Sequence, residues 1–330
     1  MSVSLACKYR PKSFEECVGQ PVVVSVLSRQ IATKTFKSAY LFVGASGCGK
    51  TSVARIMASE INNRQSDPIE IDAASNNGID NVRAIISDAR QTSLDSDYKV
   101  YILDECHAFS NQAWQALLKL IEEPPYNTIF IFCTTNPDKI PDTIMTRVQR
   151  FDFNKISNKD IVDRLEFILN EEIIKVYDKS ALERIAYLSN GLMREAISLM
   201  DKCIAYGDLT LENVEKVLGL LKYDYLFNLL NAFKSNDSEK AFKILDTIKL
   251  SVDYKKLFDI FLDFLINCAI YSKTNNFEIV NIPDKYISDV DTTIDYYIYI
   301  DTVFKYRQLL LSEDAEQLFK ILIMELCRKE

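Results

Sequence analysis

Short apolar runs alternate with amphipathic stretches through the first half of the chain. Four runs have the length and composition of strands that are buried on both faces: 39–43, 69–73, 99–103 and 128–134. Three intervening segments place apolar residues three and four positions apart, as amphipathic helices do: 50–61, 79–90 and 111–123. Buried strands that alternate with helices predict a parallel sheet covered by helices, in an α/β layer.

After about residue 154 the pattern is helical almost throughout. Seven of the eight prolines lie at or before Pro141 and five of the eight glycines at or before Gly78, so few breakers interrupt the later helices. From about residue 220 the helices become longer and more hydrophobic. We therefore expect domains at 1–155, 156–220 and 221–330, the last an all-α packing or oligomerisation domain without catalytic residues.

Composition narrows the class of protein. A chain of 330 residues with 48% hydrophobic and 26% charged residues is typical of a soluble globular protein with two or three domains. No apolar run approaches the ~18 residues that span a bilayer, and no secretory signal is visible, so we expect a cytoplasmic protein. The net charge of −8 argues against a surface coated with nucleic-acid-binding residues, but it is compatible with a local basic face.

A glycine-rich stretch, GASGCGKT, follows the first predicted strand and opens a helix. It matches G-x-x-x-x-G-K-[ST], whose glycines let backbone N–H groups surround phosphate oxygens. Lys50 can reach the β- and γ-phosphates of a nucleotide, and the Thr51 hydroxyl can bind Mg²⁺. A fortuitous glycine-rich turn is the alternative, which the strand and helix context disfavours. We expect nucleotide contacts from Gly44, Ala45, Ser46, Gly47, Cys48, Gly49, Lys50, Thr51 and Ser52.

Two adjacent carboxylates end the third predicted strand, in the sequence DECH. We expect Asp104 to hold Mg²⁺ together with Thr51 and water, and Glu105 to polarise the attacking water as general base. A metal site at DECH is disfavoured, because one histidine and dispersed cysteines supply no paired ligand spacing. Cys106 is expected to pack and His107 to cap or join a polar network, with a sensor role for His107 left open.

Several stretches resemble the AAA+ clamp-loader ATPases, and among them the gamma/tau subunits of bacterial DNA polymerase III. They follow the family's order over about the first 220 residues: 8–20, 71–83, 116–141, 146–153 and 191–201. The resemblance implies an α/β P-loop AAA+ module with a parallel five-stranded sheet and flanking helices. A small helical lid and an all-α C-terminal collar would follow.

The resemblance also implies roles for single residues around the nucleotide. Thr135 would be sensor 1, a hydroxyl between Asp104 and the γ-phosphate, although a strand-end threonine without a role is the alternative. Arg194 would be sensor 2, which touches the γ-phosphate in cis and couples the lid to the nucleotide. The family's N-terminal box folds over the adenine, which implies contacts from Tyr9, Arg10, Val18 and Gly19.

The implied activity needs an oligomer. Arg147 would act in trans as an arginine finger on a neighbour's ATP, with a surface salt bridge as the alternative. The implied function is ATP-driven opening of a sliding clamp and its release on primed DNA, within an assembly of five subunits. DNA phosphates would be contacted without sequence preference by Arg83 and by the helix start at Ser110 and Asn111, although a solvated Arg83 is the alternative.

The chain departs from the family's pattern in three places. Segment 62–68 contains no cysteine where the family carries a four-cysteine zinc module, so no zinc is expected; Thr146 replaces the usual serine and Val148 the usual cysteine. A tau-like tail is lacking, so we expect no polymerase coupling through such a tail, and a phage or a reduced genome would suit this compact form.

A Holliday-junction branch-migration ATPase is the nearest alternative, which the helical C-terminal third disfavours. A DECH helicase lacks its second α/β domain here, and intact Lys50 and Glu105 argue against a ring subunit that does not hydrolyse ATP.

Overall fold

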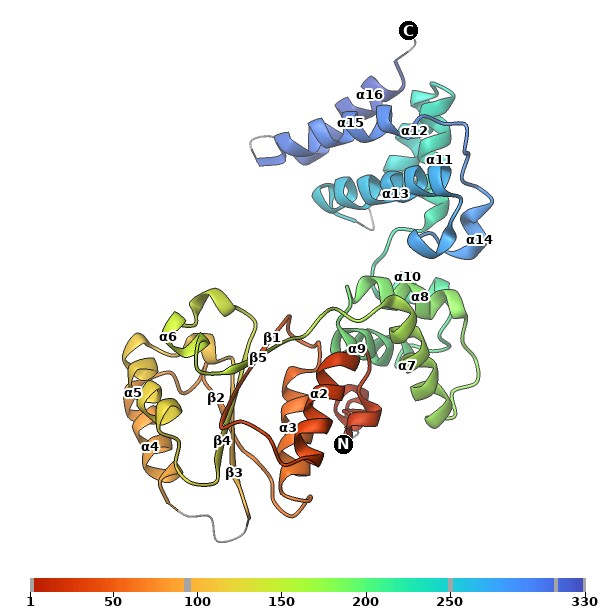
Figure 1. Cartoon of the computed structure of the whole chain (residues 1–330). Helices are drawn as coiled ribbons and strands as arrows, with labels where there is room; N and C mark the ends of the chain where they lie inside the picture. The colour runs from red at the N-terminus through yellow and green to blue at the C-terminus, as the bar shows by residue number, and fades with distance from the viewer. Residues whose placement is uncertain (1–2, 92–95, 249–251, 312–313, 329–330) are drawn as a thin grey trace. The chain divides into compact units, whose positions relative to one another are not determined.

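The computed structural model describes residues 3–91, 96–248, 252–311 and 314–328, which form two compact units (Figure 1). The first unit comprises residues 1–172 and 188–198, and the second comprises residues 173–187 and 199–330. The three domains expected from the sequence, with boundaries at 155 and 220, stay a prediction. Within the described ranges, the helices are too short or too polar to serve as membrane spans.

A five-stranded parallel sheet with the strand order β2-β3-β4-β1-β5 forms the middle of the first unit. Its strands are β1 Ala39–Val43, β2 Ile69–Asp72, β3 Lys99–Asp104, β4 Thr128–Thr134 and β5 Gln149–Asp152. All residues of β1 and β4 are buried, which explains their unbroken apolar sequences. The fifth strand lies at the edge beside β1 and is only partly buried. It contains no apolar run, so only the family resemblance implied it.

Helices cover both faces of the sheet (Figure 1). Those of the first unit are α1 Leu5–Lys8, α2 Pro21–Ala32, α3 Lys50–Ile61, α4 Ile79–Ala89, α5 Asn111–Glu122, α6 Asp142–Met145 and α7 Asn158–Glu171, with the turns η1 Phe14–Glu16, η2 Cys106–Ala108 and η3 Pro137–Lys139. Alternate strand side chains enter two cores: Leu41 packs with α4 and α5, and Phe42 packs with α2 and α3. The α/β layer predicted from the apolar runs is confirmed.

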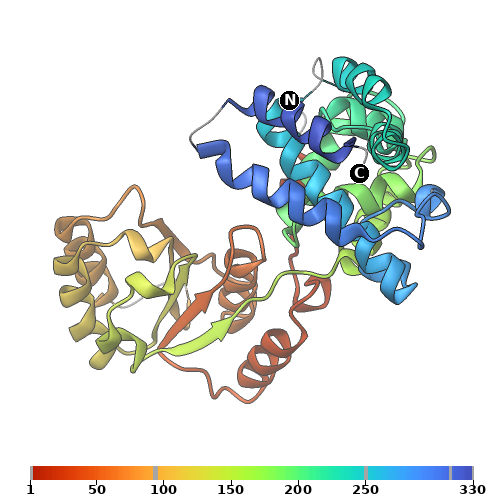
Figure 2. The ribbon, with the colours of Figure 1, turned by 90° about the horizontal axis from the view of Figure 1, so that it is seen from above.

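Helices account for most of the second unit. They are α8 Lys179–Leu188 and α9 Met193–Ile204, each shared with the first unit, then α10 Leu211–Val217, α11 Tyr223–Lys234, α12 Ser238–Ile248, α13 Tyr254–Thr274, α14 Asp284–Ile287, α15 Tyr296–Gln308 and α16 Ala315–Leu326, with the turns η4 Phe277–Ile279 and η5 Leu309–Leu311. Helices α13, α15 and α16 pack side by side (Figure 2). Aromatic side chains such as Phe233, Phe261 and Phe319 lie in the buried core of this unit, as expected from their helical spacing.

Candidate nucleotide-binding and catalytic site

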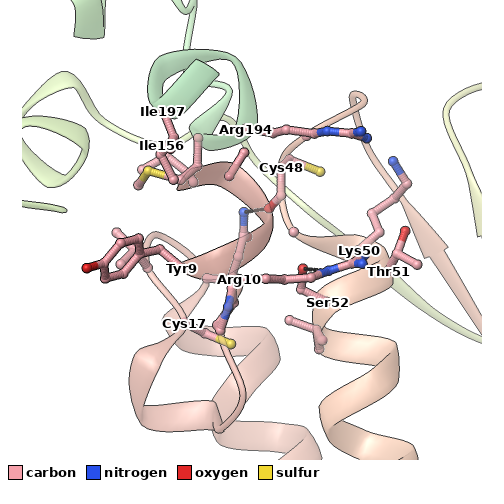
Figure 3. Close-up of a pocket in the computed structure, with 18 of the residues that line it drawn as sticks. Tyr9, Arg10, Cys17, Cys48, Lys50, Thr51, Ser52, Ile156, Arg194 and Ile197 are labelled. Atoms are coloured by element: carbon pink, nitrogen blue, oxygen red, sulfur yellow. Dashed lines mark hydrogen bonds between the residues drawn. The ribbon is translucent and has the colours of Figure 1, made fainter. Parts of the chain in front are cut away.

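The glycine-rich loop joins β1 to α3 at the carboxyl end of the sheet (Figure 3). Gly47 and Gly49 have φ values of +84° and +106°, a conformation that residues with a Cβ atom rarely adopt. A Cβ atom at Gly44 would lie 2.6 Å from the carbonyl oxygen of Phe153, so the chain needs glycine there to pass the segment after β5. The loop's path therefore depends on glycine at three positions.

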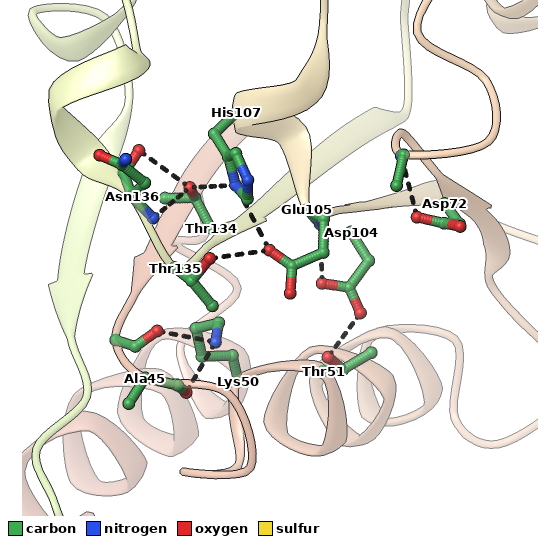
Figure 4. A network of polar contacts seen from close by, with 12 residues as sticks. Ala45, Lys50, Thr51, Asp72, Asp104, Glu105, His107, Thr134, Thr135 and Asn136 are labelled. Atoms are coloured by element: carbon green, nitrogen blue, oxygen red, sulfur yellow. Dashed lines mark hydrogen bonds and ion pairs between the residues drawn. The ribbon is translucent and has the colours of Figure 1, made fainter. Parts of the chain in front are cut away.

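Lys50 and Thr51 begin α3 and face the inside of the site. The Lys50 side chain is buried, and its Nζ donates to the carbonyl oxygens of Gly44 and Ala45 at 2.9 Å each. Thr51 Oγ1 donates to Oδ2 of Asp104, the last residue of β3, at 2.7 Å (Figure 4). A hydroxyl beside a carboxylate supplies the hard oxygen ligands that Mg²⁺ takes. These two residues fit a magnesium site.

Glu105 follows Asp104 in a left-handed backbone conformation, with φ 46° and ψ 40°. Its Oε2 accepts a hydrogen bond from Thr135 Oγ1 at 3.1 Å and lies 3.3 Å from Nδ1 of His107 (Figure 4). The side chain remains one-third exposed, at 33%. The carboxylate expected to act as general base is thus held by the threonine expected to be sensor 1.

The other two residues of the DECH sequence, Cys106 and His107, have different surroundings. Cys106 is fully buried in the core beneath α5, and burial raises the pKa of its thiol far above the ordinary value. His107 Nδ1 lies 3.2 Å from the hydroxyl of Thr134 and so belongs to the polar network around Glu105. Both outcomes agree with the packing and network roles expected from the sequence.

The N-terminal segment closes the pocket on the side away from the sheet (Figure 3). Arg10 Nε donates to Ser52 Oγ at 3.2 Å, and burial lowers the pKa of the Arg10 guanidinium, as does nearby Arg55. Tyr9 lines the pocket with its ring, while its hydroxyl donates to Glu172.

Gln20 joins three parts of the site that are far apart in the sequence. It is 4% exposed, and its Nε2 donates to the carbonyl oxygens of Cys48 at 3.3 Å and Asn154 at 2.7 Å. Gly19, with φ +79°, precedes it, and a Cβ atom there would lie 2.7 Å from the side chain of Ile156. The N-terminal segment, the phosphate loop and the segment after β5 are thereby fixed to one another.

Arg194 lies in the first turn of α9 and is close to the loop, since a Cβ atom at Gly47 would be 3.3 Å from that of Arg194. Its side chain and that of Lys50 point toward the same end of the pocket (Figure 3). Two cationic groups at this end provide a local positive field in a chain with an overall negative charge.

Most residues predicted for the site line a single pocket: Tyr9, Arg10, Val18, Ser46, Gly47, Cys48, Gly49, Lys50, Thr51, Ser52, Asp104, Glu105 and Arg194. Thr135 reaches this group through its hydrogen bond to Glu105. Sequence reasoning missed other lining residues, among them Cys17, Gln20, Ile156, Arg164 and Ile197. An apolar residue that forms a pocket wall gives the same sequence pattern as one in a core, so no local signal distinguishes Ile156 or Ile197.

Seven further predicted residues are not among those that line this pocket: Gly19, Gly44, Ala45, Arg83, Ser110, Asn111 and Arg147. Arg147 forms an ion pair with Glu122, and Arg83, with a 66% exposed side chain, pairs with Asp80 at 3.1 Å. Ser110 caps α5 by accepting a hydrogen bond from the Ala113 amide at 3.2 Å, directly before Asn111. The single chain shows these local partners, while the roles in trans and in DNA binding stay predictions.

Cysteines form no metal site in the part of the chain that the structure describes, where no cluster of three or more His, Cys, Asp or Glu side chains is arranged to hold an ion. All eight cysteines are free thiols and six of them are buried. Burial raises the pKa of Cys17, in the pocket wall, to about 11, so this thiol stays protonated at neutral pH. The chemistry of the pocket therefore depends on its oxygen and cationic groups.

Two family models and a set of solved structures match parts of this chain. The family model for the DNA polymerase III delta subunit matches residues 65–157, and the model for the ATPase lid domain of the DNA polymerase III clamp loader subunit matches residues 160–209. A solved structure of the Thermotoga maritima RuvB Holliday junction branch migration motor has a TM-score of 0.55 at 21% identity, over 68% of this chain and 79% of that chain. At this identity the likeness shows a shared fold alone.

Relatives with higher identity are subunits of DNA polymerase III. DNA polymerase III subunit tau of Bacillus subtilis is 36% identical over 294 residues, which cover 82% of this chain and 52% of that protein, so the chain spans about half its length. DNA polymerase III subunit gamma of Buchnera aphidicola from Acyrthosiphon pisum is 33% identical over 289 residues, which cover 80% of each chain. On this similarity, the chain belongs to the family of DNA polymerase III gamma and tau subunits.

Proposed function

We propose that this chain is an ATP-hydrolysing clamp-loader subunit, which opens a polymerase sliding clamp and releases it on primed DNA. The observation that carries the proposal is the 2.7 Å bond between Thr51 and Asp104, with Glu105 directly beside it in a pocket formed by the phosphate loop. Membership of the gamma and tau family supplies the biological context.

The site fits a magnesium nucleotide. Thr51 and Asp104 would hold Mg²⁺, which when bound offsets the negative charge of the phosphates. The loop's backbone N–H groups and Lys50 would bind the phosphates, and Tyr9, Arg10, Val18 and Gly19 would surround the base. No zinc is required by this arrangement.

Hydrolysis follows from the placement of Glu105. A water oxygen attacks the γ-phosphorus while Glu105 accepts the water's proton, and the bond from the γ-phosphorus to the bridging oxygen of ADP breaks. Thr135 positions the carboxylate, and Lys50 and Arg194 stabilise the charge on the γ-phosphate. Arg147 would add its charge from a neighbouring subunit.

The proposed partners are a sliding clamp, further loader subunits in an assembly of five, and primed DNA, in the cytoplasm of a bacterial or phage-infected cell. Arg83 and the start of α5 at Ser110 and Asn111 would contact DNA phosphates, so binding should weaken steeply with salt. Branch migration is less well supported, because among the described residues after β5 the only β-pairing is the isolated bridge Tyr177 to Leu209.

An ATPase assay with a purified candidate clamp and primer–template DNA, added separately and together, tests the proposal. We expect the two together to stimulate turnover most, and Glu105→Gln to bind ATP and clamp while turnover falls by ~10²–10⁴-fold. Glu239→Gln is the matched control, because Glu239 lies on an exposed helix face of the second unit and, among the residues that the structure describes, forms its ion pair with Lys243. Wild-type turnover in Glu105→Gln would show that the assigned base is wrong.

A further inference from the structure

His107, the only histidine of the chain, lies behind the carboxylate of Glu105. Its Nδ1 is 3.3 Å from Oε2 of Glu105 and 3.2 Å from Oγ1 of Thr134 (Figure 4). The same Oε2 also accepts the hydrogen bond from Thr135 at 3.1 Å. One oxygen of the carboxylate thus lies beside polar groups from two directions, one on η2 and one directly after β4.

The hydrogen bonds of Thr134 indicate which ring nitrogen of His107 carries the proton. Thr134 is fully buried, and its hydroxyl accepts from the Asn136 amide at 3.0 Å and donates its one proton to the Asn136 carbonyl oxygen at 3.2 Å. It therefore faces His107 with a lone pair. Ionised Glu105 is also only an acceptor. With acceptors on both sides of Nδ1, this arrangement favours the tautomer that carries the proton on Nδ1.

We infer that His107 is a positioning residue for Glu105. The Nδ1–H group of His107, together with the Thr135 hydroxyl, holds Oε2 of Glu105 in place. This inference rests on the proposed function, since it assigns a role toward the same general base. Among the described residues Oε1 of Glu105 has no hydrogen-bond partner, and it points toward the phosphate loop and α3 (Figure 4). Fixing Oε2 leaves Oε1 as the oxygen that accepts the water's proton.

Three substitutions distinguish the contribution of the Nδ1–H group to activity from that of the rest of the His107 side chain. The side-chain amide nitrogen of asparagine is separated from the backbone by as many bonds as Nδ1 of histidine. The amide nitrogen of glutamine is separated by as many bonds as Nε2 of histidine. We expect His107→Gln and His107→Ala to lower kcat about tenfold, less than the ~10²–10⁴-fold effect of losing a general base. Binding of ATP should be unchanged, and His107→Asn should keep most of the activity. Equal kcat for His107→Ala and the wild type would overturn the inference.

The tautomer of His107 can also be measured by spectroscopy, without any ATP turnover. With ¹⁵N-labelled histidine, the full-length chain gives a single imidazole signal set, whose nitrogen shifts identify the tautomer at mildly alkaline pH. We expect the Nδ1–H form in the wild type and a change of the imidazole shifts in Glu105→Ala. An Nε2–H tautomer would overturn the inference. If the Nδ1–H form is found but clamp and DNA elicit no ATP hydrolysis, the proposed function fails while the pairing of His107 with Glu105 stands.

Discussion

Arg147, which follows α6, forms an ion pair with Glu122, the last residue of α5, with Nη2 of the arginine 2.7 Å from Oε1 of the glutamate. Nη1 also donates to the carbonyl oxygen of Thr143 at 2.7 Å. The two side chains are 39% and 40% exposed. A pair this exposed contributes about 0–1 kcal/mol, so it orients the guanidinium without holding it strongly. If Arg147 acts in trans as proposed, a neighbour's phosphate would displace Glu122 at small cost.

We predict that Arg147→Ala leaves ATP binding intact and lowers turnover by ~10³–10⁵-fold within an assembly, because the finger would be missing from each neighbouring site. Mixing this variant with Lys50→Ala should restore part of the activity, since a Lys50→Ala subunit still supplies Arg147 to its neighbour. Turnover of the mixture against each variant alone is the measurement. Full activity of Arg147→Ala by itself would contradict the role in trans.

Removing the charge of Glu122, the partner of Arg147, should affect turnover much less than removing Arg147 itself. Glu122→Gln should change the free energy of unfolding by no more than about 1 kcal/mol, because the pair is exposed. Turnover should stay within a few-fold of the wild type, since the arginine remains and its bond to Thr143 is intact. Thermal unfolding and steady-state kinetics check both expectations. A loss as severe as that of Arg147→Ala would show that Glu122 itself takes part in hydrolysis.

Gly191 lies three residues before Arg194 at a position that excludes a side chain. Its φ is +81°, and a Cβ atom would lie 2.6 Å from that of Lys155. We predict that Gly191→Ala destabilises the chain by about 1–3 kcal/mol and weakens ATP binding, because the start of α9 must shift. Gly78→Ala is the control, with an ordinary φ of −80° and no atom within 4 Å of the added Cβ. Equal unfolding midpoints for the two variants would contradict this reasoning.

The sequence predicts the parts of the fold and site that depend on local patterns. Unbroken apolar runs indicate β1 and β4 because these strands are buried on both faces, and the loop before Lys50 is identified by its glycines. The edge strand β5 cannot be predicted in this way, since only Phe151 of its four residues is buried and two of the others are exposed.

Contacts between distant segments are not encoded in such patterns. Gln20 and Asn154 are 134 positions apart, and nothing around the glutamine distinguishes it from a surface residue. His107 and Thr134 meet because β3 pairs with β4, an order that only the folded sheet determines. The residues that position the site are therefore harder to predict than those that perform its chemistry.

A buried hydroxyl beside a carboxylate should make stability depend on pH. Tyr101, on β3, is 1% exposed and its hydroxyl donates to Asp88 of α4, which Lys99 also contacts at 3.1 Å. The hydrogen bond from Tyr101 lowers the pKa of the Asp88 carboxyl, and Lys99 lowers it further. A carboxyl with a lowered pKa in the folded state stabilises the fold above its ordinary pKa, and this contribution is lost as the pH falls through the folded value.

We predict that Tyr101→Phe lowers the free energy of unfolding at pH 7 by about 1 kcal/mol, the usual contribution of a hydrogen bond. The difference from the wild type should shrink as the pH falls below about 4, because Asp88 becomes protonated in both proteins and the charge-assisted bond is lost. Urea denaturation at neutral and acidic pH measures this. Tyr126→Phe, at a 93% exposed side chain, should show no such effect. A difference that is constant with pH would mean that Tyr101 stabilises through packing alone.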